Sequence, residues 1–389
     1  MNEPSVILHK GKDKAVRNRH HWIFSGAVRS LPEFENGGIL PVRTADGEFL
    51  GRAYFNRNCS ILGRMLSFDD RPPLEVLREN IERAVAMRTS FFDASTTASR
   101  LINGEGDGIP GLIADRYGDV LVVQVSTLGM DRLKPFVLDV LAKATEARSI
   151  YERSNLPSRR EEGLPMVEGL LAGDPVGTVE VLENGLRFRV DIVQSQKTGL
   201  YLDQRENRRL VRSWAAGRRV LNAFSYTGGF SVFALAGGAA SADSVDISER
   251  AIGLARENCA LNGFMAENVR FHVADVFDFI RDDALDYDLV ILDPPSFAKK
   301  KSEVVPACRG YKDIHRIVFQ KVPRPCLVLT FSCSFFVDET LFRQVLFQAA
   351  SEAARKVRIL QRHHQAYDHP VNIYHPETEY LKGFLLYVD

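Results

Sequence analysis

The sequence predicts an α/β protein in which two smaller domains precede a parallel sheet covered by helices on both faces. The chain has 389 residues, more than one core usually serves. It is 45% apolar and 26% charged, the composition of a soluble globular protein. From about residue 184 strand-like and helix-like segments alternate, which is the pattern of a parallel sheet. We expect domains at residues 1–70, 71–183 and 184–389.

Charge and cysteine content narrow the classes of function. Lys+Arg and Asp+Glu each total 50, so nucleic-acid binding would need a local basic surface. The sequence has no uncharged apolar run of membrane-spanning length, and its first 14 residues do not resemble a signal peptide. Five widely spaced cysteines favour neither a disulfide framework nor a zinc site. A cytoplasmic protein is expected, and a homodimer is left open.

The first domain is predicted to be a small β-barrel. Strand-like runs at 38–42, 49–54 and 60–66 are separated by turn signals at 35–38 and 46–47. Ahead of them, segment 9–22 is rich in basic residues and contains a single acid. The segment is either a solvated surface arm or a patch that contacts RNA phosphates. The candidate phosphate contacts are Lys10, Lys12, Arg17 and Arg19.

The second domain is predicted to be a small α+β unit that follows a linker at 69–73. Its expected elements are a helix at 74–92, strands at 112–114 and 120–125, a helix at 134–147 and a strand at 149–152. The glycine-rich run 103–111 resembles a phosphate loop only superficially. It is acidic, lacks the Gly-Lys-Ser/Thr ending and leads into a strand, so we interpret it as structural.

The third domain is expected to form the parallel sheet. Strands are predicted at 219–223, 242–246, 269–273, 289–293 and 326–332, with a terminal strand pair at 356–366 and 380–388. Helices are predicted at 229–237, 248–262, 276–282 and 338–356. In such sheets ligands bind at the carboxyl ends of the strands.

The ends of the first three strands predict an adenosine-cofactor site. The first strand runs into Gly228 and Gly229, which let the backbone approach a ligand. Asp246, at the tip of the second strand, is placed to accept hydrogen bonds from ribose hydroxyls, and Asp275 could bind the adenine amino group. A simpler interpretation is that Asp246 and Ser248 only cap the next helix.

The fourth strand ends in the sequence Asp-Pro-Pro-Ser-Phe. A strand that runs into two prolines must stop hydrogen bonding there, so Asp293 and Phe297 are expected to project into the cleft. A turn of this kind in this place is typical of methyltransferases. The carboxylate and the carbonyls of Pro294 and Pro295 can hold a planar base, on which the aromatic ring can stack. The simpler interpretation is a turn without a function.

The fifth strand predicts a nucleophile. Cys333 follows the apolar run, between two serines, in the exposed polar setting that a reactive thiolate needs. Cys259 and Cys326 have the spacing of core residues, and Cys59 belongs to the first domain. Cys308, expected in a polar loop, is the rival nucleophile.

A cysteine is required for methylation at carbon 5 of a pyrimidine. That carbon becomes nucleophilic only after a thiolate adds to carbon 6, and the later loss of the carbon-5 proton expels the thiolate. Exocyclic amines and ring nitrogens need no covalent step. Cys333 therefore favours carbon-5 chemistry over a methyltransferase for a ring nitrogen or an amino group. Two further hypotheses stay open: uridine as the base, and an RNA-binding protein without catalytic activity.

Nearly the whole chain resembles the RlmI-type family of 23S rRNA cytosine-5 methyltransferases. The matching segments are 19–27 (RHHWIFSGA), 104–117 (GEGDGIPGLIADRY), 197–208 (KTGLYLDQRENR), 224–229 (FSYTGG), 293–297 (DPPSF) and 332–334 (SCS). The resemblance implies an N-terminal PUA RNA-binding domain, a central α+β domain and a Rossmann-like class I methyltransferase domain that uses S-adenosylmethionine. It further implies that Cys333 is the nucleophile, that 23S rRNA is the partner, and that segment 197–208 closes over the cofactor.

From the motifs and the resemblance together we expect a defined set of site residues. Cys333 and Asp293 are the predicted catalytic residues. The residues expected to contact the cofactor are Tyr201, Gln204, Phe224, Ser225, Tyr226, Gly228, Asp246, Ile247, Asp275, Val276 and Asp293. The residues expected to contact RNA are Lys10, Lys12, Arg17, Arg19, Pro294, Pro295 and Phe297.

The chain departs from the family pattern in two places. Pro323-Arg324-Pro325 stands where Pro-Gly-Gly is usual, and His315 stands near an Asn-type position. Many other RNA cytosine-5 methyltransferases have a second cysteine in the Asp-Pro turn, a region where this chain has Ser296. The base that removes the carbon-5 proton is therefore left open.

Overall fold

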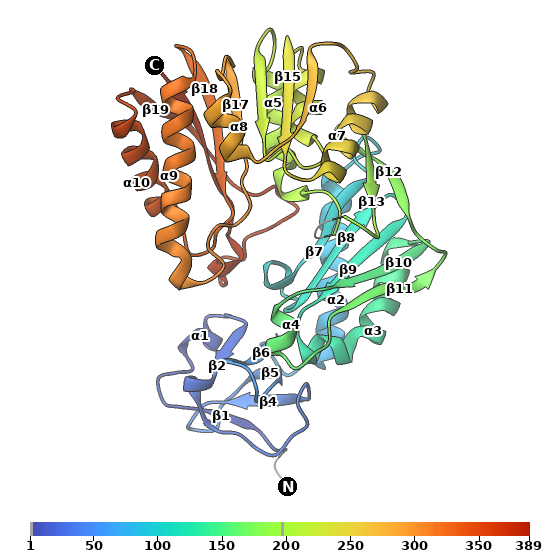
Figure 1. Cartoon of the computed structure of the whole chain (residues 1–389). Helices are drawn as coiled ribbons and strands as arrows, with labels where there is room; N and C mark the ends of the chain where they lie inside the picture. Colours follow the sequence, from blue (N-terminus) through green and yellow to red (C-terminus); the bar gives the residue numbers. More distant parts are fainter. Residues whose placement is uncertain (1–2, 196–197) are drawn as a thin grey trace. The chain divides into compact units, whose positions relative to one another are not determined.

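The structure is a computed structural model that describes residues 3–195 and 198–389 (Figure 1). Its contacts divide the chain into two compact units. Unit 1 comprises Met1–Leu182, Val190–Leu202 and Tyr367–Thr378. Unit 2 comprises Glu183–Arg189, Asp203–Ala366 and Glu379–Asp389. The chain therefore passes between the units several times, and both are built from separate stretches of sequence.

The N-terminal part of unit 1 is a sheet with the order β2-β6-β5-β4-β1-β3. The predicted strands are β4 (Ile39–Arg43), β5 (Phe49–Phe55) and β6 (Ile61–Ser67), each within two residues of expectation. Strands β1 (Val6–Leu8), β2 (Trp22–Phe24) and β3 (Val28–Ser30) and helix α1 (Lys14–Arg17) were not predicted. Each of these strands has three residues, too few for an alternating pattern to show.

The rest of unit 1 is built on a sheet with the order β11-β10-β9-β8-β7. Its strands are β7 (Ala98–Asn103), β8 (Leu112–Tyr117), β9 (Val120–Val125), β10 (Ser149–Ser154) and β11 (Val167–Gly173). Helices α2 (Pro73–Phe91) and α3 (Leu128–Thr145) contribute to its core, and a short helix α4 spans Ser158–Glu161. Helix α3 begins six residues before the predicted start and has Pro135 inside it, a residue that usually marks a boundary. The glycine-rich run leads into β8, as predicted.

Unit 2 contains the predicted parallel sheet, with the order β16-β15-β14-β17-β18-β20-β19. Its strands are β14 (Arg219–Ala223), β15 (Ser241–Asp246), β16 (Val269–Val273), β17 (Leu289–Leu292), β18 (Cys326–Ser332), β19 (Val357–His363) and β20 (Lys382–Val388). Strand β20 runs antiparallel to both neighbours, β18 and β19. A separate two-stranded sheet pairs β12 (Thr178–Glu183) with β13 (Leu186–Asp191).

Helices pack on both faces of the seven-stranded sheet because its buried residues alternate. Leu221 and Val290 belong to the core cluster that includes α8 (Val276–Asp282), α9 (Val304–Lys321) and α10 (Glu339–Glu352). Val220 and Leu289, their neighbours in sequence, belong to the cluster formed with α5 (Arg205–Trp214) and α6 (Gly229–Ala236). Successive strand residues point to opposite faces, so both faces need a cover. The remaining helix, α7 (Glu249–Leu261), follows β15.

One predicted loop is a helix. The sequence predicts a polar loop around Cys308, but this residue lies in the first turns of α9, whose apolar residues recur at helical spacing. Pro306 and Gly310 obscure that period in the sequence. Within the described residues, no helix has both the length and the apolar character needed to span a bilayer.

Candidate active site

The turn after β14 has a tightly coiled backbone. Phe224 and Tyr226 have positive φ angles of 60° and 46°, and Gly228 follows at 77°. The Ser225 N–H donates to the carbonyl of Val245 at 2.9 Å, which ties the turn to the neighbouring strand. A Cβ on Gly228 would lie 2.8 Å from the Ala255 side chain, so glycine is required there for space as well as for conformation. The predicted cofactor-binding turn is therefore a compact loop at the carboxyl end of the sheet.

Asp246 is fixed at the tip of β15 by two backbone groups. Its Oδ2 accepts the N–H of Tyr226, and its Oδ1 accepts the N–H of Ser248, both at 2.9 Å. Each carboxylate oxygen keeps a second lone pair, so the group can still accept from the two hydroxyls of a ribose. Ile247 beside it is 71% exposed, which leaves an apolar surface next to the carboxylate. Ser248 caps α7 through the N–H of Ala251, as expected.

Asp275 acts as a helix cap. Its Oδ1 accepts the N–H groups of Phe277 and Asp278 at 2.7 and 3.3 Å, at the start of α8. Val276, the next residue, is buried in the core of unit 2. The sequence suggests helix capping for Asp246 and Ser248, and Asp275 has such a role as well. The cap engages only Oδ1 of Asp275.

The structure brings Cys333 to the Asp-Pro-Pro turn. Strands β17 and β18 are parallel neighbours, with Leu292 opposite Thr330, so the residues that follow them meet at one edge. Sγ of Cys333 lies 3.9 Å from the carbonyl oxygen of Pro294, within the range of a thiol hydrogen bond. Cys333 is partly buried, more enclosed than the exposed setting that the sequence analysis expected.

Ser334 connects the two strand tips. Its buried hydroxyl lies 3.1 and 3.3 Å from the N–H groups of Phe297 and Ala298 and 3.2 Å from the hydroxyl of Ser296. The Tyr311 hydroxyl lies 3.1 Å from the same oxygen, and burial raises the pKa of Tyr311 to about 12. Ser334 therefore holds the turn against the segment that carries the thiol. Ser334 belongs to the Ser-Cys-Ser motif, but the motif does not indicate that its hydroxyl binds the Asp-Pro-Pro turn.

The aromatic ring of the turn is packed against other rings. The Phe297 ring lies 4.7 Å from that of Tyr311 and 6.2 Å from that of Phe277, measured between centroids. Phe297 is partly buried, whereas Pro295 is exposed. In this arrangement Pro295 is more accessible to a substrate than the predicted stacking residue.

The other cysteines have distinct environments. Cys259 and Cys326 are buried, which confirms that they are core residues, and burial raises the pKa of each thiol to about 12. Cys308 is partly buried against the core of unit 2, and burial raises the pKa of its thiol as well. Cys59 belongs to unit 1 and lies in the turn between β5 and β6.

The segment expected to close over the cofactor contributes to both units. Tyr201 belongs to unit 1 and Gln204 to unit 2. Gln204 is buried and accepts a hydrogen bond from the side chain of Asn207 at 2.6 Å. Lys197, where the segment begins, lies outside the described residues.

The basic segment of unit 1 is partly neutralised. Lys10, Lys12 and Arg19 are exposed, but Arg17 forms ion pairs with Asp13 and with Glu48. Glu48 comes from the turn before β5, more than 30 residues from Arg17, so the sequence of segment 9–22 gives no sign of this ion pair. Arg19 also lines a cavity of about 500 Å³, together with Arg71, Arg83 and other polar residues of unit 1.

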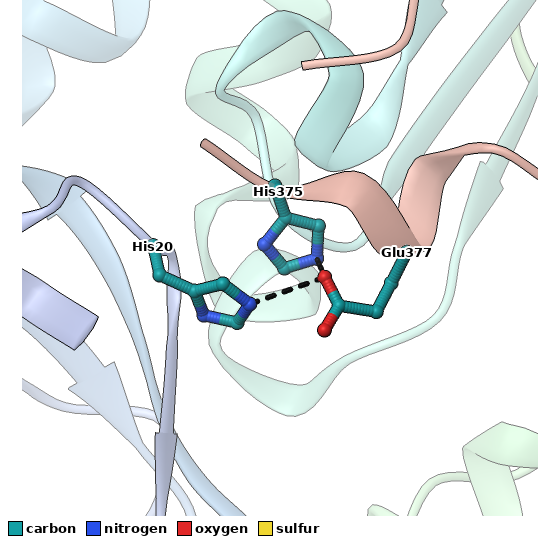
Figure 2. A group of neighbouring side chains, drawn as sticks. All are labelled: His20, His375 and Glu377. Carbon is teal, nitrogen blue, oxygen red and sulfur yellow. Dashed lines mark hydrogen bonds and ion pairs between the residues drawn. The ribbon is translucent and has the colours of Figure 1, made fainter. Parts of the chain in front are cut away.

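Unit 1 also contains a cluster of His20, His375 and Glu377 (Figure 2). Nδ1 of His20 accepts the N–H of Trp22 at 3.1 Å, so the proton of the neutral ring is on Nε2, which faces the Glu377 carboxylate at 3.2 Å. The His375 ring lies 4.2 Å from the His20 ring, and burial lowers the pKa of His375 to about 4. His20 and Glu377 thus form a hydrogen bond, and the His375 ring packs against that of His20.

Two family models match the chain. The model for an S-adenosylmethionine-dependent methyltransferase matches residues 155–370, and the model for a PUA-like domain matches residues 6–68. The chain belongs to the family of S-adenosylmethionine-dependent methyltransferases, with a PUA-like domain at its N-terminus. S-adenosylmethionine is therefore the cofactor, as the family resemblance implied, and it contains the adenosine group that the strand ends predicted.

Individual relatives are similar over almost their full length. "Ribosomal RNA large subunit methyltransferase I" of Shewanella denitrificans is 40% identical, and the match covers 98% of both chains. The protein of the same name from Photobacterium profundum is 39% identical over 99% of both chains. The crystal structure of SMU.776 complexed with SAH covers 99% of this chain and 100% of that chain, with a TM-score of 0.86 at 24% identity. This last match confirms the fold.

Proposed function

We propose that this protein methylates carbon 5 of a cytosine in 23S ribosomal RNA, through a covalent adduct between Cys333 and carbon 6. The observation that carries the proposal is the 3.9 Å approach of the Cys333 thiol to the carbonyl of Pro294 in the Asp-Pro-Pro turn. The names of the 40% and 39% identical relatives supply the class of RNA. The exposed Lys10, Lys12 and Arg19 of the PUA-like domain are the proposed RNA contacts.

Several residues of unit 2 fit the adenosyl part of the cofactor. Asp246 offers carboxylate oxygens to the ribose, and Ile247 is an exposed apolar neighbour for the adenine. The loop of Phe224, Tyr226 and Gly228 provides a closely approachable backbone, and the buried Ser225 hydroxyl lacks a hydrogen-bond partner among the described residues. S-adenosylmethionine, when bound there, supplies an electrophilic methyl group on a sulfonium.

The reaction then depends on two side chains of the chain itself. The Cys333 thiolate adds to carbon 6 of cytosine, forming a C–S bond and moving electron density to carbon 5, which accepts the methyl group. Asp293 accepts a hydrogen bond from the amino group or holds a proton on ring nitrogen 3. With that proton in place, the negative charge that the ring gains on thiolate addition is neutralised. Removal of the carbon-5 proton by a base restores the double bond, breaks the C–S bond and releases the thiolate.

RNA that contains 5-fluorocytosine tests this proposal. Fluorine at carbon 5 cannot leave as a proton does, so wild-type protein with S-adenosylmethionine should form a covalent complex that survives denaturing electrophoresis. Cys333→Ser should abolish both trapping and methyl transfer, while Cys308→Ser, the matched control, should keep both. Trapping that depends on Cys308 would move the nucleophile into α9. Retained methylation without any trapping would overturn carbon-5 chemistry and favour a ring nitrogen or an amino group.

A further inference from the structure

Lys382 is held beside the tip of β18 by main-chain groups. It begins β20 and stands opposite Ser332, the last residue of β18, in the antiparallel register. Its Nζ donates to the carbonyl oxygens of Ser334 and Tyr380 at 2.7 and 2.8 Å. The bond to Ser334 brings the ammonium to the segment that contains Cys333. A lysine side chain loses much conformational freedom when two hydrogen bonds fix it, so this placement is well defined.

The charges around this ammonium couple it to the thiol. Burial lowers the pKa of Lys382 to about 8, because it penalises the charged form. Among the charged groups that oppose this effect, the Cys333 thiolate acts most strongly, ahead of Asp338 and Glu379. Electrostatic interaction between two ionisable groups is reciprocal, so a cation that is favoured by a thiolate favours the thiolate equally.

The groups whose charges act on Lys382 are acidic. They are the Cys333 thiol and the carboxylates of Asp338 and Glu379. Tyr311 of α9 experiences the charges of both Cys333 and Asp293, so the thiol, this phenol and the Asp293 carboxylate form one group of acids. A thiolate that forms among acids is opposed by their negative charges, and the ammonium of Lys382 offsets that effect.

We propose that Lys382 is a positioning residue whose ammonium stabilises the thiolate form of Cys333 before the thiolate attacks a base. This inference rests on the proposed covalent function and deepens it. The thiol proton passes to solvent when the thiolate forms, and Lys382 stays protonated beside it. A Lys382 that only bridges two carbonyl groups would stabilise the loop and leave the reactivity of Cys333 unchanged.

Alkylation of the purified full-length protein measures this effect without the RNA reaction. Iodoacetamide reacts with thiolates, so the alkylation rate of the Cys333 peptide, followed by mass spectrometry from pH 6 to 9.5, reports the ionisation of this residue. Lys382→Met removes the charge and the hydrogen bonds, Lys382→Gln removes the charge but keeps a donor, and Lys382→Arg keeps the charge. At pH 7 we expect Lys382→Met and Lys382→Gln to slow the alkylation of Cys333 about tenfold and to raise the pH midpoint of the rate. Lys382→Arg should retain most of the rate.

Cys308 is the internal control in the same samples. It lies in α9 of the same unit, and its alkylation should have the same rate in every variant if the fold is intact. An unchanged Cys333 midpoint in Lys382→Gln, with unchanged Cys308, would overturn the inference. If Cys308 is alkylated faster in Lys382→Met but not in Lys382→Gln, the Met variant has lost its fold. The result for Cys333 in Lys382→Gln then tests the inference. The alkylation assay does not depend on 5-fluorocytosine trapping, so a failure of the proposed function is recorded separately.

Discussion

At the scale of single residues, Asp246 combines a structural role with its proposed binding role. Its two oxygens each hold a backbone N–H, one from the Tyr226 turn and one from Ser248. The carboxylate is therefore already oriented before a ligand arrives, which lowers the entropic cost of binding. The same hydrogen bonds mean that a substitution here affects the turn as well as the ligand.

Asp246→Ala should weaken S-adenosylmethionine binding by roughly 1.5–3 kcal/mol, because it removes a charged acceptor for ribose hydroxyls. Isothermal titration calorimetry on the full chain measures the loss. Asp246→Asn is the matched variant, since it keeps one oxygen for a backbone N–H and should lose less. Unchanged affinity in a folded Asp246→Ala protein would mean that the ribose acceptor lies elsewhere.

Among the residues of the candidate site, the sequence predicts Cys333 but not the roles of Ser334 and Lys382. Cys333 was predicted because a thiol past the end of an apolar run is unusual, and the structure brings it to the predicted turn. Ser334 stands in the same motif, but the four groups that contact its hydroxyl come from residues more than 20 positions away in the chain. Lys382 had no local signal, because its neighbours are set by the antiparallel pairing of β18 with β20.

At the scale of elements, the parallel strands were predictable and the longest helix of unit 2 was not. Strands β14, β16 and β18 have the predicted bounds. Strands β14 and β18 are largely buried and apolar between turns, whereas the edge strand β16 shows the alternation of apolar and polar residues of a half-exposed strand. Helix α9 was missed because its polar residues and Pro306 suggested a loop. Inside α9, His315 is fully buried, with Nδ1 2.6 Å from the Tyr311 carbonyl and Nε2 2.7 Å from the Thr330 hydroxyl.

His315 should make the protein sensitive to acid. Burial lowers its pKa from 6.5 to about 4, so between these values the unfolded chain binds more protons and stability falls as pH falls. On lowering the pH from 7.5 to 5, His315 should cost about 2 kcal/mol of the free energy of unfolding. Urea unfolding at the two pH values should show a smaller loss for His315→Gln than for wild type. Substitution of the exposed His9 is the control, and equal losses in all three proteins would contradict the prediction.

At the scale of the whole molecule, the absence of net charge confines RNA binding to local surfaces. The chain has 50 basic and 50 acidic residues, and many of the basic residues are paired. In the basic segment, Arg17 is held by Asp13 and Glu48, while Lys10, Lys12 and Arg19 are exposed. The structure thus separates residues that the sequence analysis had grouped.

Neutralising Lys10, Lys12, Arg17 and Arg19 together should weaken binding of unmodified ribosomal RNA and flatten its salt dependence. The slope of log K against log salt should fall by about one for each lost phosphate contact, and Lys10, Lys12 and Arg19 should account for the change. Filter binding at several salt concentrations gives the slope. Arg17→Gln alone should leave it unchanged, and cofactor affinity should not move. An unaltered slope in the combined variant would mean that the segment is only a solvated surface.

The repeated passage of the chain between the two units has a practical consequence for dissecting the protein. A fragment that starts near residue 184 would carry Val190–Leu202 and Tyr367–Thr378 without the rest of their unit, and a fragment that ends there would lack both. Neither fragment corresponds to one whole unit, so a loss of RNA or cofactor binding in either would not locate the binding site. Likewise, a single protease cut in the β12–β13 hairpin should leave two polypeptides that co-purify. The C-terminal polypeptide supplies Val190–Leu202 and Tyr367–Thr378, two segments of unit 1. Functions are better separated in this protein by point substitutions than by truncation.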